Sequence, residues 1–446
     1  MFPVRLPRRL AGDPVDRPAV VTAPEELRID GPRLLALLRR FAGFGADEAG
    51  GVSRVGFGAA DTAVRRYLAA RSRDAGLRAD VDPAGNLIIR RDRPLPPDGG
   101  VLLMGSHLDS VVRGGTLDGA YGVAAAFETL LVLAAHDAPM RYEPVVIAFA
   151  NEEGSLFPQP FWGSMAVAGT LTDAAGAVDT AGRSIRGPLA DAGGDLDRIS
   201  EAAWPAGSVA GYLELHIEQG PVLTRRNCPI GVVDGIVGRT VFEIEVVGRQ
   251  NHAGTTPMDD RVDALVAAAR LVLLIREIAA ERNACAVSTV GSLTVQPSVT
   301  NVVPGQVRLT AEVRDLRAER LRAAEAAVAA VADQVRREYG VRIDVRMTLA
   351  APPRTTDDRL RNAIADAADD LGLSWLPLAS GAGHDAQIIA DIAPIGMIFV
   401  PSRDGISHAP EEFTEDEHLV AGADVLLRSA ARLLRMPAVA RAGADR

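Results

Sequence analysis

The sequence predicts an α/β protein in which a smaller α+β domain interrupts a larger domain of alternating strands and helices. The chain has 446 residues, which is too long for a single compact core. Apolar runs of strand length alternate with helical stretches in its first half, and near Gly238 the pattern changes to alternating strands and long amphipathic helices. The first pattern returns after Pro352 and Pro353. We therefore expect one domain built from residues 1–237 and 351–446 and an inserted domain at 238–350.

The larger domain is expected to contain a sheet with helices on both faces. Apolar residues at helical spacing predict helices at Ile29–Ala42, Asp61–Ala75 and Ala120–Ala135. Short apolar runs predict strands at Asn86–Arg91, Val101–Gly105, Val145–Ala150, Tyr212–Ile217 and Ile395–Val400. The order strand, helix, strand around Ala120–Ala135 indicates a βαβ unit and therefore a parallel sheet. The Gly- and Asp-rich stretch Thr170–Gly211 predicts loops and short helices.

The inserted domain has the element order strand, helix, strand, strand, helix, strand. Strands are predicted at Thr240–Val247, Ala286–Gln296, Val307–Arg314 and Val341–Leu349. Long amphipathic helices are predicted at Arg261–Arg282 and Leu316–Tyr339. This order is the ferredoxin-like arrangement, and its open sheet face and outward helices suit a lid or a dimer surface.

Charge and cysteine content disfavour several classes of protein. The 48 Lys and Arg against 58 Asp and Glu leave a formal charge of −10, which argues against a nucleic-acid or anionic-membrane partner. The longest apolar runs, such as Val123–Leu133, are too short to cross a bilayer, and the basic cluster Arg5–Arg9 lacks the apolar run of a signal peptide. Two distant cysteines, Cys228 and Cys285, offer no disulfide framework, so a reducing, cytoplasmic location is expected.

The glycine-rich segment Gly105–Gly119 carries the first candidate site residues. His107 and Asp109 follow a buried strand two positions apart, so their side chains can share one side of an extended segment. A carboxylate there can hold the far N–H of the imidazole, as beside a metal-bound histidine. Asp118 follows among glycines that let the backbone bend closely around a site. On its own, the segment is also compatible with a surface turn.

Two adjacent carboxylates, Glu152 and Glu153, follow the strand Val145–Ala150. Like charges this close disfavour each other's ionisation, so a buried pair is expected where a cation binds or a proton moves. If one of them ligates a metal, its neighbour can act as a general base towards water. A solvated loop is the alternative, but open α/β sheets gather their ligands at strand ends of this kind.

Three further histidines, His216, His384 and His408, lie near predicted strand ends beside glycine and carboxylates. One such histidine alone is more often structural than a ligand, but three together favour a site. The candidate ligands make two nitrogen- and oxygen-rich sites that share one carboxylate: His107, Asp118, His216, His408 and one of the adjacent glutamates. Such sites suit Zn²⁺, Mn²⁺ or Co²⁺, with two ions roughly 3.5–4 Å apart.

Other chemistries find little support in the sequence. Gly381–Ala386 formally matches the GxGxxA dinucleotide fingerprint, but the helix that it would open, Asp385–Asp391, is cut short before Pro394. Too few residues follow to complete a nucleotide-binding half. No GxSxG elbow and no P-loop occurs, so a serine hydrolase of that type and a P-loop NTPase have no support.

With these motifs assembled, the chain resembles the hydantoinase/carbamoylase group of amidases within the M20-type metallo-hydrolases, over segments from Gly105 to Glu412. The resemblance implies a metallo-exopeptidase-like α/β catalytic domain with an inserted ferredoxin-like α+β lid and dimerisation domain. It implies two divalent ions per subunit, Zn²⁺ or else Mn²⁺, Co²⁺ or Ni²⁺. Asp118 would bridge them, and the implied metal ligands are His107, Asp118, Glu153, His216 and His408. Glu152 would be the general base. Asp109 is also expected to take part in catalysis, because its carboxylate would hold His107.

The resemblance also implies residues that bind a small anionic ureido or amide substrate. Arg314 can take a substrate carboxylate in a bidentate manner, and Asn301 can donate to it. His252 and His384 would polarise the scissile carbonyl or stabilise the oxyanion. Gln219 completes the set. Without the resemblance, an edge charge and a turn residue are the favoured interpretations of Arg314 and Asn301.

The implied reaction is hydrolysis of a ureido C–N bond, converting an N-carbamoyl-L-amino acid to the L-amino acid, carbon dioxide and ammonia. Allantoate amidohydrolase and β-ureidopropionase are alternatives within the group, and an M20-type aminoacylase or peptidase is a more distant one. A metal-dependent binding protein without catalysis is the alternative from another class. The resemblance also implies a homodimer through the lid, with His252 acting in the neighbouring subunit's site. One departure, Leu156 where many members have Arg, leaves the preferred substrate open.

Overall fold

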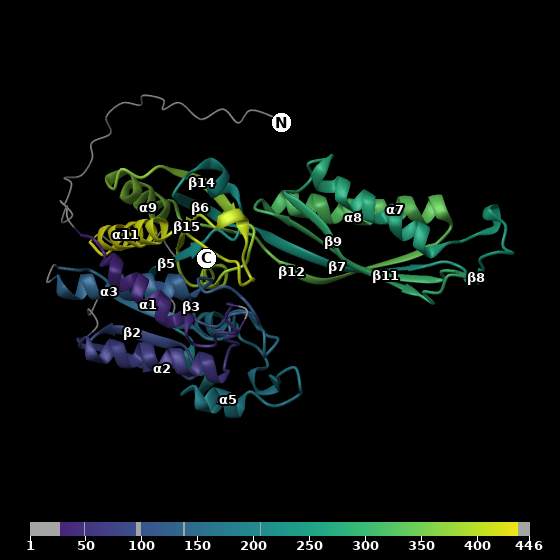
Figure 1. The fold of residues 1–446 in the computed structure, drawn as a ribbon. Coiled ribbons are helices and arrows are strands. Elements are labelled where there is room, and N and C mark those ends of the chain that lie inside the picture. Colours follow the sequence, from purple (N-terminus) through teal and green to yellow (C-terminus); the bar gives the residue numbers. More distant parts are fainter. Residues whose placement is uncertain (1–26, 49, 95–99, 137–138, 206, 436–446) are drawn as a thin grey trace, which may run out of the picture.

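The computed structural model describes residues 27–48, 50–94, 100–136, 139–205 and 207–435. The basic cluster Arg5–Arg9 lies outside these residues. The described strands form a nine-stranded sheet, a four-stranded sheet and a two-stranded ribbon. Figure 1 shows the nine-stranded sheet within a large body of helices, from which the four-stranded sheet projects to one side.

The nine-stranded sheet has the order β1-β2-β4-β3-β5-β15-β6-β13, and β14 pairs with β6. Its strands are β1 (Leu77–Val81), β2 (Leu87–Arg91), β3 (Val101–His107), β4 (Glu143–Phe149), β5 (Val209–Ile217), β6 (Ile230–Ile236), β13 (Arg354–Thr355), β14 (Trp375–Ser380) and β15 (Ile395–Val400). The central strands β4, β3, β5 and β15 are parallel, and every residue of β3 and β4 is buried. The predicted βαβ unit is present as β3, α3 (Ala120–Ala135) and β4.

The flanks of this sheet contain antiparallel pairs, so the expectation of a parallel sheet holds for its centre and for the pair β6 and β14. On one flank, β1 is antiparallel to β2, and β2 is antiparallel to β4. The turn from β1 to β2 is short, and the Asp82 side chain accepts the N–H groups of Ala84 and Asn86 within it. A turn of this length can join only antiparallel strands, because a parallel pair needs a long crossover. On the other flank, β6 is antiparallel to β15.

Helices pack on both faces of the nine-stranded sheet. Besides α3, the helices of this body are α1 (Gly31–Ala42), α2 (Ala59–Asp74), α4 (Trp162–Ala168), α5 (Arg186–Asp191), α6 (Val222–Arg226), α9 (Asp358–Asp370), α10 (Asp385–Ile389) and α11 (Asp416–Leu433), of which α5 packs in a peripheral cluster. Short 3₁₀ helices lie at Ala174–Gly176, Leu196–Ala202, Met258–Asp260 and Arg403–Gly405. One apolar core joins α1, α3, α9 and α11 to one face, and another lies on the opposite face beside α10. The described residues of the stretch Thr170–Gly211 form loops and short helices as predicted, although β5 already begins at Val209.

The four-stranded sheet is antiparallel and has the order β12-β7-β11-β9. Its elements follow the chain order predicted from the sequence: β7 (Gly238–Val247), α7 (Ala264–Ala280), β9 (Val287–Gln296), β11 (Gln306–Asp315), α8 (Ala318–Tyr339) and β12 (Arg342–Ala351). One face packs against α7 and α8 in a separate apolar core. Among the described helices, Figure 1 shows none on the other face. Helix α7 begins later than predicted because Asp263 caps it, accepting the N–H groups of Leu265 and Val266.

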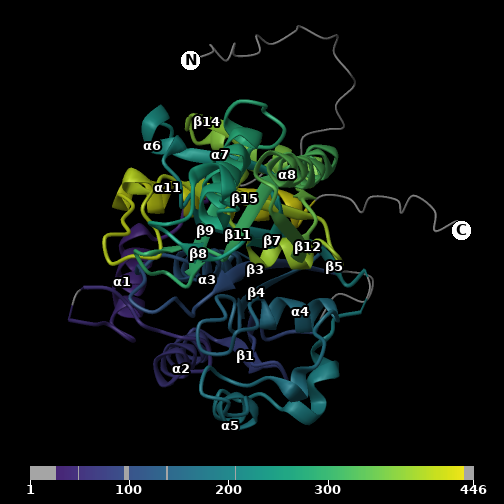
Figure 2. The same ribbon diagram turned by 90° about the vertical axis from the view of Figure 1, so that its right-hand side faces the viewer.

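A two-stranded ribbon extends this sheet at the end away from the nine-stranded sheet. It pairs β8 (Asn251–His252) with β10 (Val302–Val303), and His252 lies opposite Val302. The sequence did not predict the ribbon because strands of two residues carry no detectable alternation. Figure 2 views the molecule from this end.

Candidate functional site

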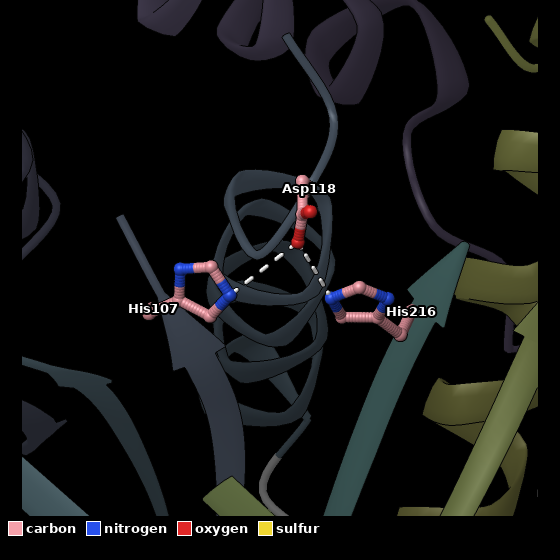
Figure 3. Close-up of side chains that lie close together, drawn as sticks. All are labelled: His107, Asp118 and His216. Carbon is pink, nitrogen blue, oxygen red and sulfur yellow. Dashed lines mark ion pairs between the residues drawn. The ribbon is translucent and has the colours of Figure 1, made fainter. Parts of the chain in front are cut away.

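Two histidines lie level with each other at the carboxyl ends of neighbouring parallel strands. His107 ends β3, His216 is the penultimate residue of β5, and Met104 of β3 pairs with Leu213 of β5. Continuing this register brings both rings to the same edge of the sheet. Asp118 meets them from the loop before α3, with Oδ1 3.5 Å from Nε2 of His107 and 3.0 Å from Nε2 of His216 (Figure 3).

A glycine allows this close approach of the Asp118 loop. Gly119 has a φ of 63°, and a Cβ atom there would lie 2.4 Å from ring atoms of His107. Any other residue would be strained in this backbone conformation and would also displace the imidazole. The glycine-rich composition around Asp118 therefore serves the geometry of the site.

The opposite nitrogens of both rings contact backbone carbonyls. Nδ1 of His107 lies 2.9 Å from the carbonyl oxygen of Asp109, and Nδ1 of His216 lies 2.8 Å from that of Ile217. Since a carbonyl only accepts, each Nδ1 carries a proton, and in the neutral form of each ring Nε2 presents a lone pair to Asp118. A nitrogen lone pair and a carboxylate oxygen repel each other unless a proton or a metal ion lies between them. The donor set therefore fits a metal ion.

A second group of possible ligands lies around the other oxygen of Asp118. Oδ2 of Asp118 is 3.1 Å from Nε2 of His408, which is 3.5 Å from Oε1 of Glu153. That glutamate oxygen is buried and accepts no hydrogen bond. The ligand atoms lie within 4.8 Å of one another in each of three groups: His107, Asp118 and His216; Asp118, Glu153 and His408; and His107, Glu152 and Glu153. Each group could hold a metal ion, and we refer to the first two, which share Asp118, as the ligand groups.

Asp109 holds the first histidine differently from the prediction. Its backbone carbonyl, and not its carboxylate, bonds to Nδ1 of His107, since Oδ1 is 4.0 Å from that nitrogen. The carboxylate instead accepts the backbone N–H groups of Glu152 and Glu153, both at 3.1 Å. These N–H groups follow the end of β4 and need an acceptor when buried. Asp109 therefore connects β3 to both glutamates, and the expectation that its carboxylate orients the imidazole is wrong.

The carboxylates of the site have displaced pKa values. Burial raises the pKa of Glu152 well above its usual range, and the charge of Glu153 adds to this. Burial also raises the pKa of Glu153 to about 7, with a further contribution from the charge of Asp118. Burial opposes ionisation of Asp118 as well, but hydrogen bonds from the three facing histidines hold its pKa well below the usual range. A buried carboxylate that accepts a proton beside one that stays ionised suits acid–base chemistry.

The histidine rings differ in charge. The hydrogen bond with Asp118 raises the pKa of His408 to about 9. Burial alone would lower the pKa of His107, but the charge of Glu152 and the contact with Asp118 raise it well above the usual range. Burial and the nearby His216 lower the pKa of His384 well below the usual range, so this ring is neutral.

Glu412 holds the Asp118 loop from behind, a role that the sequence did not reveal. Its Oε1 accepts the backbone N–H groups of Leu117 at 2.9 Å and Asp118 at 3.1 Å, and its Oε2 accepts the Ser407 hydroxyl at 2.8 Å. Its position four residues after His408 was the one signal in the sequence, but this signal does not distinguish Glu412 from the adjacent Glu411. Glu412 links the two loops that carry Asp118 and His408.

Three of the expected substrate residues lie at or near the ligand groups. Gln219 donates from Nε2 to Oδ2 of Asp118 at 2.9 Å. The buried His384 ring is 4.6 Å, centroid to centroid, from the ring of His216. Arg314 donates from Nη1 to the carbonyl of Gly381 at 2.6 Å, three residues before His384 along the chain.

His252 and Asn301 lie together on the distal ribbon. The N–H of Ala253, which follows His252, donates to the carbonyl of Asn301 at 2.9 Å, and both side chains are exposed. Nδ1 of His252 accepts the N–H groups of Gly254 and Thr255, so the neutral ring keeps its proton on Nε2 and can donate outwards. Figure 1 shows β8, which carries His252, at the end of the four-stranded sheet remote from β3 and β5. Within one subunit, these two residues are not brought to the ligand groups.

Leu156, which follows the glutamate pair, packs against an apolar cluster that includes Phe157, Trp162 and Leu189. Its side chain is partly buried there.

The class of this protein follows from comparison with known protein families. Residues 103–432 match the model of peptidase family M20/M25/M40, and the chain belongs to this family. It is 40% identical over 401 residues to the N-carbamoyl-L-amino acid amidohydrolase of Geobacillus stearothermophilus, covering 89% of this chain and 97% of the relative. It is 36% identical over 390 residues to the allantoate amidohydrolase of Escherichia coli, covering 86% and 93%.

A solved structure has a similar fold over most of the chain. The hydantoinase/carbamoylase family amidase from Burkholderia multivorans superposes with a TM-score of 0.84 at 33% identity, covering 92% of this chain and 99% of the other. Within the residues that the structure describes, no helix has both the length and the apolar composition needed to cross a membrane.

Proposed function

We propose that this protein is a dimetal amidohydrolase that cleaves the C–N bond of a ureido group. The proposed substrates are N-carbamoyl-L-amino acids, converted to L-amino acid, carbon dioxide and ammonia, and allantoate or N-carbamoyl-β-alanine is the alternative. The observation that carries the proposal is the position of Asp118, whose two oxygens each face a different group of possible ligands. The relatives named for N-carbamoyl-L-amino acids and for allantoate support the substrate class.

The proposed metal ligands are His107, Asp118, Glu153, His216 and His408. Their imidazole and carboxylate donors suit Zn²⁺, Mn²⁺, Co²⁺ or Ni²⁺. Ions bound there would polarise the scissile carbonyl and lower the pKa of water.

Glu152 is the proposed general base. It is buried, its Oε2 lies 3.7 Å from Nε2 of His107, and its raised pKa suits a group that takes up a proton. It would take a proton from the attacking water and return it to the leaving nitrogen. Asp109, which holds the backbone N–H of Glu152, would keep the base in place.

The substrate would lie between the ligand groups and the residues around Gly381–His384. Arg314 would bind its carboxylate, since the guanidinium already reaches the carbonyl of Gly381. His384, buried and neutral, would polarise the scissile carbonyl. Gln219, which donates to Asp118, would contact the ureido group from the opposite side.

We also propose that residues 1–237 and 351–446 are the catalytic domain and that residues 238–350 are a lid through which two subunits dimerise. His252 and Asn301 would then enter the neighbouring subunit's site, which accounts for their exposure far from their own. Strand β9 supports this proposal because it lies at the edge of its sheet. A long exposed edge strand is usually protected or paired with another chain.

Apolar side chains beside this edge support the same interface. Leu265, Val266 and Leu273 on α7 and Val287 and Leu293 on β9 are large apolar residues that are 37–56% exposed. Exposed large apolar residues on an edge strand and on the helix that packs against it suit a contact surface. A second copy of this chain would bury them.

The decisive experiment measures ammonia release from N-carbamoyl-L-amino acids, N-carbamoyl-β-alanine and allantoate, with and without Mn²⁺, Co²⁺ or Zn²⁺. N-acetyl amino acids and dipeptides serve as comparison substrates for the more distant aminoacylase or peptidase alternative. Metal-dependent turnover of a ureido compound is expected. Turnover of only the acetyl or peptide substrates would overturn the proposed substrate class, and metal binding without turnover of any amide would indicate a binding protein.

The two free cysteines, Cys228 and Cys285, are both buried. Thiols of this kind are compatible with a reducing compartment, and we retain the cytoplasm as the proposed location.

A further inference from the structure

We propose that Glu214 is a positioning residue that fixes His384 against the strands that carry the metal ligands, a role that rests on the proposed function of the site. Glu214 lies on β5, two residues before His216, and it is fully buried. The Ser106 hydroxyl donates to its Oε1 at 2.8 Å, and the backbone N–H of Ala386 donates to its Oε2 at 3.0 Å. One carboxylate therefore joins β3, β5 and the start of α10.

Packing alone does not account for a glutamate at this place. The flanking residues of β5, Leu213 and Leu215, are buried and apolar, as expected for a central strand. A carboxylate removed from water is unfavourable unless its oxygens are hydrogen-bonded. Both oxygens of Glu214 accept hydrogen bonds, and a leucine at the same position could accept neither.

The bond to Ala386 supplies a cap that α10 otherwise lacks. His384 is the N-cap residue of this helix, and its side chain makes no capping hydrogen bond. The first N–H groups of a helix need acceptors from outside the helix, and Glu214 provides one from β5. The start of α10 is thereby tied to the strand that carries His216.

This tie holds His384 near the ligand groups, together with the contact of 2.9 Å between its Nε2 and the Ser380 hydroxyl. The rings of His384 and His216 are in edge-to-face contact, and the Ser106 hydroxyl adjoins His107 along β3. Releasing α10 from Glu214 would let His384 move while His107, Asp118 and His216 keep their own contacts. If His384 acts on the scissile carbonyl as proposed, its displacement weakens transition-state binding and lowers kcat more than it changes KM.

Two substitutions separate hydrogen bonding from charge. In Glu214→Gln, the amide oxygen accepts the Ala386 N–H and the amide nitrogen donates to Ser106, so both contacts survive. In Glu214→Leu, both are lost at nearly unchanged volume. We expect Glu214→Leu to lower kcat at least about tenfold with KM and metal content unchanged, a smaller loss than complete removal of an oxyanion contact. Glu214→Gln should retain most of the turnover.

A double substitution tests whether the effect passes through His384. Glu214→Leu should cause no further loss of kcat when His384 is already Ala, because residues that act through one group are not additive. Additive losses would overturn the positioning role, and so would equal damage by Glu214→Gln and Glu214→Leu.

A further measurement needs neither substrate nor metal. Amide hydrogen exchange in the peptide that contains residues 384–390 should be faster in metal-free Glu214→Leu than in wild type or Glu214→Gln. Unchanged exchange in Glu214→Leu would refute the tie between Glu214 and α10. If wild type hydrolyses no ureido compound, the proposed function fails, and the exchange result still decides what Glu214 does.

Discussion

Nε2 of His216 lies 3.0 Å from Oδ1 of Asp118, while the other nitrogen of the same ring is committed to the carbonyl of Ile217. The ring therefore cannot turn its N–H towards the carboxylate without losing the backbone contact. In the neutral ring, the Nε2 lone pair and the carboxylate oxygen repel each other unless a proton or a metal ion lies between them. The same geometry recurs at His107, which faces the same carboxylate.

Asp118→Asn should remove both metal ions, because an amide supplies a poor ligand to two cations at once and does not carry their compensating charge. Metal analysis after gel filtration is expected to give about two ions per subunit in wild type and close to none in the variant. Asp366→Asn, at an exposed position of α9, is the matched control and should keep full metal content. An Asp118→Asn protein that retains both ions would show that Asp118 is not a shared ligand.

The two ligand groups should release their ions at different rates. The side chain of His408 is 51% exposed, whereas that of His216 is 1% exposed, so a chelator reaches the second group more easily. Transfer of metal to a chromophoric chelator should be biphasic, and His408→Ala should retain one tightly held ion. His418→Ala, on α11 outside both groups, is the control. Release of both ions in a single phase from wild type would contradict this asymmetry.

Glu152→Gln should lower kcat by roughly 10²–10⁴-fold, the usual contribution of a positioned general base. The amide keeps the size of the side chain but cannot accept the proton. Metal content should be unchanged, since Glu153 and not Glu152 is the proposed ligand. Glu411→Gln, exposed beside Glu412, serves as the control for ammonia release. Full turnover by Glu152→Gln would assign the base to another group.

The sequence was sufficient for the central strands and for the candidate ligands. β3 and β4 are mostly apolar runs, and residues at the ends of parallel strands meet at one edge, so His107, His216 and one glutamate of the pair Glu152 and Glu153 were predictable candidates. The antiparallel flanks were not predictable, because strand direction there depends on a short turn. The predicted contact between His107 and the Asp109 carboxylate was also wrong. The backbone carbonyl and the carboxylate of Asp109 both lie near the ring, and the conformation of the turn decides which of them bonds to it.

Glu214 and Glu412 escaped prediction for a related reason. Each acts through backbone N–H groups of segments far away in the chain, at Ala386 and at Asp118. Sequence spacing carries no signal for such contacts, because the donor is an ordinary peptide group whose side chain is irrelevant.

Stability should depend on the titration of Asp82, the residue that closes the turn between β1 and β2. Burial raises its pKa to about 6 from an unfolded value of 3.8, so the folded state binds the proton more tightly. The stabilisation that protonation provides is fully present below the unfolded pKa and is lost as pH rises through about 6. In denaturant unfolding, the free energy of unfolding of Asp82→Asn should rise relative to that of wild type from acid to neutral pH, by about 3 kcal/mol. A difference that is independent of pH would refute the assignment.

Activity should be recovered when two inactive variants share a dimer. A His252→Ala subunit keeps Glu152 in its own site but cannot supply His252 to its partner's site. A Glu152→Gln subunit lacks the base in its own site but still supplies His252 to its partner. A hybrid dimer therefore contains one complete site, and co-expression with random pairing should restore about a quarter of wild-type turnover. The control pairs Glu152→Gln with Asp118→Asn, which damage the catalytic side of both subunits and should give no recovery. If His252 acts within its own subunit, the first pair will also remain inactive, because neither subunit then carries a complete site.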